Sequence, residues 1–474
     1  MPGNEHKFDF AQEIRKRVEN LSLLVRFRSG RRSLDLRVVF ALVAGIFPEF
    51  IVGFLAMRGN HADRYFPGPG VSRVSENIRQ SPLASAMLPS ALMKSLAHRA
   101  RLFGCNASIC LLVLLLFAIY AAGQRDNFPG HENSPVLRKA ISDAATKHKI
   151  QGIAAALIEH GQIKAIETFG FRDQKSATPV TSRTIFEAGS LGESVYTYSV
   201  LLLSAEGRFN SGAPIPTYFP LPYVRDFDAT SSSSQSESLY DPAFNQITAM
   251  RVMNHTSGMP DWAPGQHLRL QTAPGKKWSY SREGYMYLQR AVEQATSEPL
   301  ESLVTRSILA PARMARSSFS WKEAYADDVA TGYAASGAAI EPQHFSRAVV
   351  SATFYTTIRD YAQFVAYIMA SSPTARAHES AVSLMLNPTV SVDDTVHVFW
   401  GLGFGLEKIG DEVFFFHREK SSGMQCFVIA SRKSGNGIVI FTNSGNGLEA
   451  VSDILAATST TRHPVISADF LHAR

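Results

Sequence analysis

Ser190 and Glu193 are the residues best placed to do chemistry, because they stand just before an apolar, helix-like run over residues 195–203. A serine hydroxyl ahead of a helix lies near the positive end of the helix dipole and beside unpaired backbone N–H groups, which suits a nucleophile. The residue three positions later shares its face of the helix. A glutamate, with a usual pKa of about 4.3, is a poor proton acceptor for a serine hydroxyl. The segment therefore predicts a nucleophile position without an effective base.

The scaffold that positions these residues is predicted from both ends of the region after residue 125. Residues 136–148 have helical spacing, and four apolar side chains share one side: Val136, Leu137, Ile141 and Ala144. Apolar runs over 153–158 and 163–169, joined at His160-Gly161, predict an antiparallel hairpin. Near the C-terminus the pattern predicts three more strands, at 413–417, 426–430 and 438–442. A turn over 433–437 separates the last two strands, and a closing helix follows over 448–457.

Residues 190–400, between these ends, have the pattern of helices and loops, including a low-complexity loop over 231–236. Strands and helices at both ends, with helices between them, predict an α+β (mixed α/β) fold. In it an antiparallel sheet is flanked by helices and joined to a helical subdomain. We expect a ligand site between the two parts.

Several segments, in a fixed order, resemble the beta-lactamase-related serine hydrolases. This family includes class C beta-lactamases, D-alanyl-D-alanine carboxypeptidases and related esterases. The resemblance covers roughly residues 133–460 and rests chiefly on the segments 186–190, 203–207, 255–262, 280–285, 309–314, 401–405 and 441–446. It implies a beta-lactamase/transpeptidase-like fold that binds a peptidoglycan peptide, an ester or a beta-lactam, with neither a cofactor nor a metal.

The family's first motif, Ser-x-x-Lys, falls on Ser190 and Glu193. The nucleophile is kept, but the lysine that helps to take its proton is replaced by a carboxyl group. No lysine of the chain has a serine three residues before it, so the motif is not displaced elsewhere. The resemblance therefore places the nucleophile at Ser190 and marks Glu193 as the main departure from the family.

The second motif falls on Tyr280-Ser281-Arg282. In the family the tyrosine shuttles the proton to the leaving group, and its phenol needs a nearby cation to be basic near neutral pH. Arg282 stands where an amide is common. It offers a positive charge for binding, although a guanidinium cannot act as a base. The alternative is that Tyr280 is simply an aromatic residue packed near a helix start.

The third motif, Lys-Thr-Gly or His-x-Gly in the family, falls on His417-Arg418-Glu419. The histidine is kept, and the glycine that lets a substrate lie against the strand is lost. Glu419 adds bulk and negative charge where a substrate carboxylate is expected. The resemblance assigns an oxyanion-hole N–H to the backbone of Lys420.

Two other places in the sequence, His255 and Lys433-Ser434-Gly435, resemble catalytic groups but fit structural roles better. His255 is an alternative base, although His-Thr-Ser-Gly in the family is usually a structural turn. Lys433-Ser434-Gly435 resembles Lys-Thr-Gly by its letters, yet it falls in a predicted turn between two strands.

Composition excludes several classes of function. The hydrophobic content of 45% is typical of a globular protein. The net charge of +6 reflects basic residues concentrated in the first hundred positions and does not indicate nucleic-acid binding. There is no zinc spacing, P-loop or dinucleotide fingerprint. The three cysteines, Cys105, Cys110 and Cys426, predict no disulfide framework in the C-terminal region.

The N-terminal part predicts export or anchoring. An apolar run over 109–122 follows basic residues and ends in small ones, which is typical of a signal peptide over residues 93–124, with Met93 as the start. Residues 1–92 are then an extension of doubtful origin. The alternative is a membrane anchor or a two-span protein that uses the apolar stretch 38–57. A linker over 125–132, the hydrolase-like domain over 133–460 and a tail over 461–474 follow. The protein is expected to be periplasmic, extracellular or membrane-anchored.

Departures in all three motifs favour a family member with weak or absent catalysis that binds a cell-wall fragment or a protein partner. The alternative is an active serine hydrolase, in which Ser190 is acylated while Tyr280 and Glu193 accept its proton.

Overall fold

The computed structural model describes residues 133–467, except 222, 226–236, 240, 262–268 and 373. The chain divides into two units at Asp126 and Asn127, and every described residue belongs to the second. The expected N-terminal extension, signal peptide or anchor, linker and low-complexity loop (1–92, 93–124, 125–132 and 231–236) lie outside the described residues. None of the described helices is both long enough and apolar enough to cross a bilayer.

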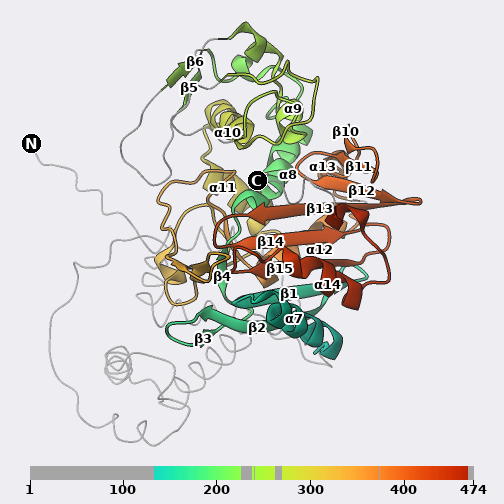
Figure 1. Ribbon diagram of the computed structural model, residues 1–474. Coiled ribbons are helices and arrows are strands. Elements are labelled where there is room, and N and C mark those ends of the chain that lie inside the picture. The colour runs from blue at the N-terminus through green and yellow to red at the C-terminus, as the bar shows by residue number, and fades with distance from the viewer. Residues whose placement is uncertain are drawn as a thin grey trace, which may run out of the picture. The chain divides into compact units, whose positions relative to one another are not determined.

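One nine-stranded sheet organises the described region, with the order β10-β11-β12-β13-β14-β15-β1-β2-β3 and antiparallel pairing throughout (Figure 1). Its strands are β1 Gly152–Glu159, β2 Gln162–Asp173, β3 Thr178–Pro179, β10 Val390–Asp393, β11 Val398–Trp400, β12 Gly405–Ile409, β13 Glu412–Lys420, β14 Gln425–Ala430 and β15 Gly437–Thr442. Because β1 pairs with β15, the two ends of the chain join in the middle of the sheet.

Three two-stranded pairs and the helices complete the fold. The pairs are β4 Ile185–Glu187 with β9 Tyr355–Thr357, β5 Tyr223–Arg225 with β6 Glu237–Leu239, and β7 Gly332–Tyr333 with β8 Ala339–Ile340. The α-helices are α7 Pro135–His148, α8 Gly192–Ala205, α9 Ala249–Met253, α10 Arg282–Thr296, α11 Leu300–Val304, α12 Ile358–Met369, α13 Arg376–Met385 and α14 Glu449–Thr458. These elements confirm the expected α+β architecture.

The sheet is covered on both faces. Along β1, Ile153 and Ala155 join a core with α7 and α14, whereas Ala154, Ala156 and Ile158 join the larger core that contains α8 and α12. Successive side chains of a strand point to opposite faces, so this division follows the alternation of the strand. Burial on both faces explains why the strands are continuous apolar runs in the sequence.

The predicted helices and strands at the two ends of the chain are confirmed, with one error. The helix over 136–148 corresponds to α7, whose buried stripe begins at Leu137 and continues through Ile141 and Ala144. Val136, expected on the same side, is 59% exposed because it precedes that stripe by about 100° of helix rotation. The hairpin turn is confirmed by positive φ angles of 52° at His160 and 73° at Gly161.

A buried carboxylate fastens the segment after α14 to the sheet. The Glu407 side chain on β12 accepts hydrogen bonds from the Val465 N–H at 2.7 Å and from His463 Nδ1 at 2.7 Å. Glu407 and Val465 are fully buried. Val465 and the partly buried Ile466 therefore pack against the core on this face of the sheet.

We expect Glu407→Ala to lower the free energy of unfolding by about 2 kcal/mol, since the buried Val465 N–H loses its acceptor. Urea unfolding measures the change. Lys408→Ala, at the exposed next position of β12, is the matched control and should change the free energy by less than about 0.5 kcal/mol. Equal effects of the two substitutions would contradict a fastening role for Glu407.

Candidate active site

Ser190 lies at the N-terminal end of the buried helix α8, in a short 3-10 turn over Gly189–Leu191. The turn is held from behind, because the N–H groups of Ala188 and Gly189 both donate to the Phe354 carbonyl oxygen, at 2.8 and 3.2 Å. Nearly every residue of α8 from Gly192 to Leu203 is buried. The nucleophile position predicted from the sequence thus sits on a rigid element, with its own side chain only 6% exposed.

A carboxylate from strand β13 covers Ser190. Glu419 Oε2 accepts hydrogen bonds from the Ser190 backbone N–H at 2.6 Å and from Ser190 Oγ at 2.7 Å. The Arg418 carbonyl oxygen is a second acceptor for Oγ, at 3.3 Å. The sequence places Glu419 near the ligand position, and the structure brings it into direct contact with the nucleophile.

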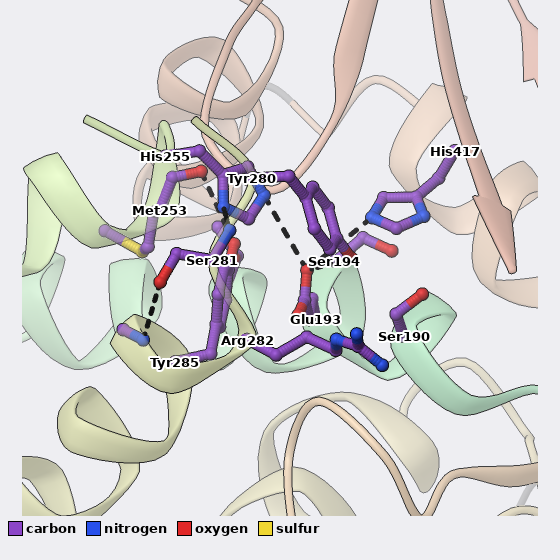
Figure 2. Close-up of polar contacts among 12 residues, drawn as sticks. Ser190, Glu193, Ser194, Met253, His255, Tyr280, Ser281, Arg282, Tyr285 and His417 are labelled. Carbon is purple, nitrogen blue, oxygen red and sulfur yellow. Dashed lines mark hydrogen bonds and ion pairs between the residues drawn. The ribbon is translucent and has the colours of Figure 1, made fainter. Parts of the chain in front are cut away.

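Glu193 lies in the first turn of α8, completely buried, where its carboxyl group meets Tyr280 from the loop before α10 (Figure 2). The Tyr280 hydroxyl donates to Glu193 Oε2 at 2.8 Å. Ser281 caps α10 by accepting from the Gly284 N–H, which fixes the adjacent Tyr280. The tyrosine therefore faces a carboxyl group where the family has a cation.

Two buried histidines complete the surroundings of Glu193 (Figure 2). Nε2 of His255 and Nε2 of His417 lie 3.7 and 3.8 Å from Glu193 Oε2. His255 Nδ1 accepts from the Ser281 N–H at 3.1 Å, so its proton is on Nε2. His417 Nδ1 lies 2.9 Å from the Arg418 carbonyl oxygen, which can only accept, so Nδ1 carries a proton. The hydrogen bond from Ser281 thereby holds His255 as a neutral tautomer.

The environment shifts the pKa values of this group toward uncharged forms. Burial raises the pKa of Glu193 well above its usual value, more than the hydrogen bond from Tyr280 lowers it. Burial also lowers the pKa of His255 and brings that of His417 to about 4. Burial and the nearby Glu193 raise the pKa of Tyr280. Burial thus favours a carboxylic acid at Glu193, a phenol at Tyr280 and neutral imidazoles at His255 and His417.

The remaining candidate binding residues lie around this centre. Arg282 makes a bidentate ion pair with Asp261, with Nε–Oδ1 and Nη2–Oδ2 both at 2.8 Å. Its charge is thus shared with a neighbour that the sequence motifs did not single out. Lys420 is an exposed residue at the end of β13, in register with Gln425. No group of three or more His, Cys, Asp or Glu side chains within the described ranges is arranged to hold a metal ion.

The other residues that resemble catalytic groups, Lys433-Ser434-Gly435 and His255, have structural surroundings. Lys433, Ser434 and Gly435 lie in the turn between β14 and β15, where Lys433 pairs with Asp411. His255 has a positive φ of 56° and packs against the Tyr280 ring with centroids 4.2 Å apart, so it supports the Tyr280 loop.

Sequence reasoning missed Glu187, whose pKa burial raises to about 7, and Trp400, whose ring packs against His255. Glu187 lies in the matched segment 186–190 but was given no role, and no motif or spacing marks Trp400.

The arrangement of a buried helix carrying a serine, with Tyr280 and His417 on adjoining elements, defines a serine hydrolase-like protein. Residues 137–460 match the family model described as Beta-lactamase, and the chain belongs to that family. This confirms the resemblance found in the sequence.

Individual relatives are distant. Esterase EstB of Burkholderia gladioli is 25% identical over 207 residues, which make up 38% of this chain and 49% of EstB. The chain thus spans about half the length of this relative. A beta-lactamase of Pseudomonas fluorescens is 21% identical over 272 residues, 57% of this chain and 73% of that protein. The octameric penicillin-binding protein homologue from Pyrococcus abyssi has a TM-score of 0.56 and 19% identity over 68% of this chain and 76% of its own, a likeness that shows the fold.

A neutral Glu193 has a consequence for stability. With its folded pKa raised above the unfolded value, the folded state holds up to one more proton than the unfolded state between the unfolded and the folded pKa of this group. Stability therefore falls as the pH rises, by up to about 1.4 kcal/mol per pH unit for this group. We expect Glu193→Gln to remove this contribution, so that its free energy of unfolding between pH 5 and 8 falls less steeply than that of the wild type.

Urea unfolding at several pH values measures the two slopes. Glu412→Gln, at the far end of β13, is the control and should keep the wild-type slope, because the pKa of Glu412 is lowered rather than raised. Identical slopes for the wild type and Glu193→Gln would mean that Glu193 is ionised in the folded protein.

Proposed function

We propose that this member of the beta-lactamase family binds an acyl compound at the Ser190 site without efficient acyl transfer. The observation that supports this most directly is the fully buried Glu193 carboxyl group, hydrogen-bonded to Tyr280 in the place of the family's lysine. A serine hydroxyl attacks a carbonyl group only when a base takes its proton. Burial favours the carboxylic acid form of Glu193, which cannot take that proton.

Tyr280 does not compensate for the missing lysine. A tyrosine accepts a proton from serine as a phenolate, and a neighbouring cation is what stabilises that form. Here burial and Glu193 both raise the pKa of Tyr280. The phenol O–H is also engaged as a donor to Glu193 Oε2. Tyr280 and Glu193 thus form a neutral pair that fixes the geometry of the site and leaves Ser190 unactivated.

The ligand class follows from the family. Its relatives include proteins named as an esterase, a beta-lactamase and penicillin-binding proteins. The ligand is therefore proposed to be a peptidoglycan-like peptide, an ester or a beta-lactam, each of which presents a carbonyl group to the serine.

Active hydrolysis through Ser190 is the second candidate, and one contact favours it. Glu419 Oε2 lies 2.7 Å from Ser190 Oγ, within reach for proton transfer. In this case Glu419 takes the proton from Oγ as Oγ forms a bond to the carbonyl carbon, and returns that proton to the leaving group as its bond breaks. A water molecule then cleaves the acyl–Oγ bond and restores the serine hydroxyl group. The same oxygen, however, also accepts from the Ser190 N–H at 2.6 Å, and that donor is needed to stabilise the oxyanion.

Labelling with a fluorescent penicillin distinguishes the two candidates. We expect no covalent label on the wild type, on Glu193→Lys or on Glu419→Gly, since each keeps at least one of the two carboxyl groups. The double variant Glu193→Lys/Glu419→Gly should label at least about 100-fold faster, because it regains a base and loses the carboxylate over Ser190. Denaturing gels of protein that begins at residue 125 measure the labelling rate.

Ser190→Ala, made in the wild type and in the double variant, is the control for the site of labelling. Label on the wild type that disappears in Ser190→Ala would defeat the non-catalytic proposal and favour the second candidate. A double variant that folds but stays unlabelled would show that Glu193 and Glu419 are not the main obstacles.

We further propose that the protein is exported or membrane-anchored, on the basis of the basic and then apolar sequence over 93–124. N-terminal sequencing of the mature protein should then give a start near residue 124 if the segment is cleaved, or near Met93 if it is retained. Peptides recovered from residues 1–92 would overturn the late start.

A further inference from the structure

The Glu419 carboxylate contacts Ser190 in the way that a bound ligand would. One carboxylate oxygen accepts from the backbone N–H and from the hydroxyl group of the same serine, at 2.6 and 2.7 Å. These are short, charge-assisted hydrogen bonds to two donors that converge on one point. An incoming carbonyl oxygen accepts from the same backbone N–H group, and an incoming carboxylate oxygen can accept from both donors.

The backbone around this contact is shaped to admit the carboxylate. A Cβ atom at Gly189 would lie 2.4 Å from Glu419 Oε2 and 2.7 Å from its carboxyl carbon, so a side chain at this position would displace Glu419. Gly189 also has a positive φ of 42°, which favours glycine. The absence of a side chain at position 189 thus leaves the space that the Glu419 carboxylate occupies.

The register of the sheet fixes the position of Glu419. It pairs with Cys426 on β14, two residues after His417, which pairs with Val428. Residues two apart on a strand share a face, so Glu419 and His417 point to the same side of β13. The carboxylate is consequently delivered to Ser190 by a central strand of the sheet rather than by a loop.

Burial raises the pKa of Glu419 above its usual value, while the two hydrogen bonds from Ser190 and the charges of Arg282 and Arg418 lower it in part. The two guanidinium groups and the start of helix α8 favour a negative charge here. The carboxyl groups of Glu187, Glu193 and Asp261 in the same surroundings weaken that field. An anionic ligand placed there would experience the same field.

We propose that Glu419 is an internal ligand of the Ser190 site, and that the site accepts an external carboxylate or acyl carbonyl group only when this side chain is displaced. The inference rests on the proposed binding function and adds its regulation. The site binds poorly while Glu419 is in place, and a ligand must compete with a carboxylate that the fold holds beside it. Cationic ligands are excluded as competitors, because both groups at the contact point are donors.

Reversible binding of a fluorescent penicillin, which carries both a carbonyl and a carboxylate group, tests this inference. Fluorescence anisotropy gives the dissociation constant for the wild type, Glu419→Gly and Glu419→Gln. We expect Glu419→Gly to bind at least about tenfold more tightly than the wild type, which corresponds to about 1.4 kcal/mol. Glu419→Gln keeps the size of the side chain but not its charge and should also bind more tightly.

Glu412→Gln is the matched control, because it removes one carboxylate from the same strand away from Ser190, and it should bind as the wild type does. Equal or weaker binding by both Glu419 variants would overturn the inference. If Glu419→Gly shows no cooperative thermal transition and is therefore not folded, the dissociation constant of Glu419→Gln alone tests the inference. A denaturing gel run on the same samples separates the two proposals: covalent label on a Glu419 variant would refute the non-catalytic function while leaving the internal-ligand inference standing.

Discussion

The chemistry proposed for the Ser190 site depends on the complete burial of the Glu193 carboxyl group in the first turn of α8. An ionised carboxylate without a full set of partners is costly in such a place, and one of its oxygens has no hydrogen-bond partner in the described structure. Burial therefore favours the carboxylic acid form of Glu193. Burial likewise favours the protonated phenol of Tyr280 and the neutral imidazoles of His255 and His417. A lysine at this position would place a positive charge in the same surroundings.

The scaffold does not depend on this chemistry. The sheet is buried on both faces by two apolar cores, and the turn of Ser190 is held by hydrogen bonds to Phe354 and by the pairing of β4 with β9. These contacts involve none of the altered motif residues. The beta-lactamase fold can consequently persist with a changed set of side chains at its centre, and fold alone does not establish function. Glu419 uses the same rigid framework, since a central strand carries it to the nucleophile.

Local patterns were enough to predict the strands β1, β2, β13, β14 and β15, the helices α7 and α14 and the position of Ser190, because apolar runs, turn residues and ordered motifs act over short distances. The shorter sheet strands β3, β10, β11 and β12 were not predicted, and β5 to β11 lie within residues 190–400, where only helices and loops were expected. The patterns were insufficient where a side chain's partner lies far away in the chain. Glu419 was expected near the ligand, but its contact with Ser190 joins positions 229 residues apart. The contacts of Arg282 with Asp261 and of His463 with Glu407 could likewise not be predicted from residue spacing. Val136 was misplaced because its apolar character outweighed its position just ahead of the buried stripe.

The protonation state of Glu193 in the folded protein at pH 7 is the central claim, and infrared spectroscopy tests it most directly. The difference spectrum between the wild type and Glu193→Gln isolates the vibrations of this one carboxyl group. We predict a carbonyl stretching band of a protonated carboxylic acid, present in the wild type and absent from the variant. A difference spectrum that contains only the bands of an ionised carboxylate would contradict the account, because Glu193 would then be a base within reach of Tyr280.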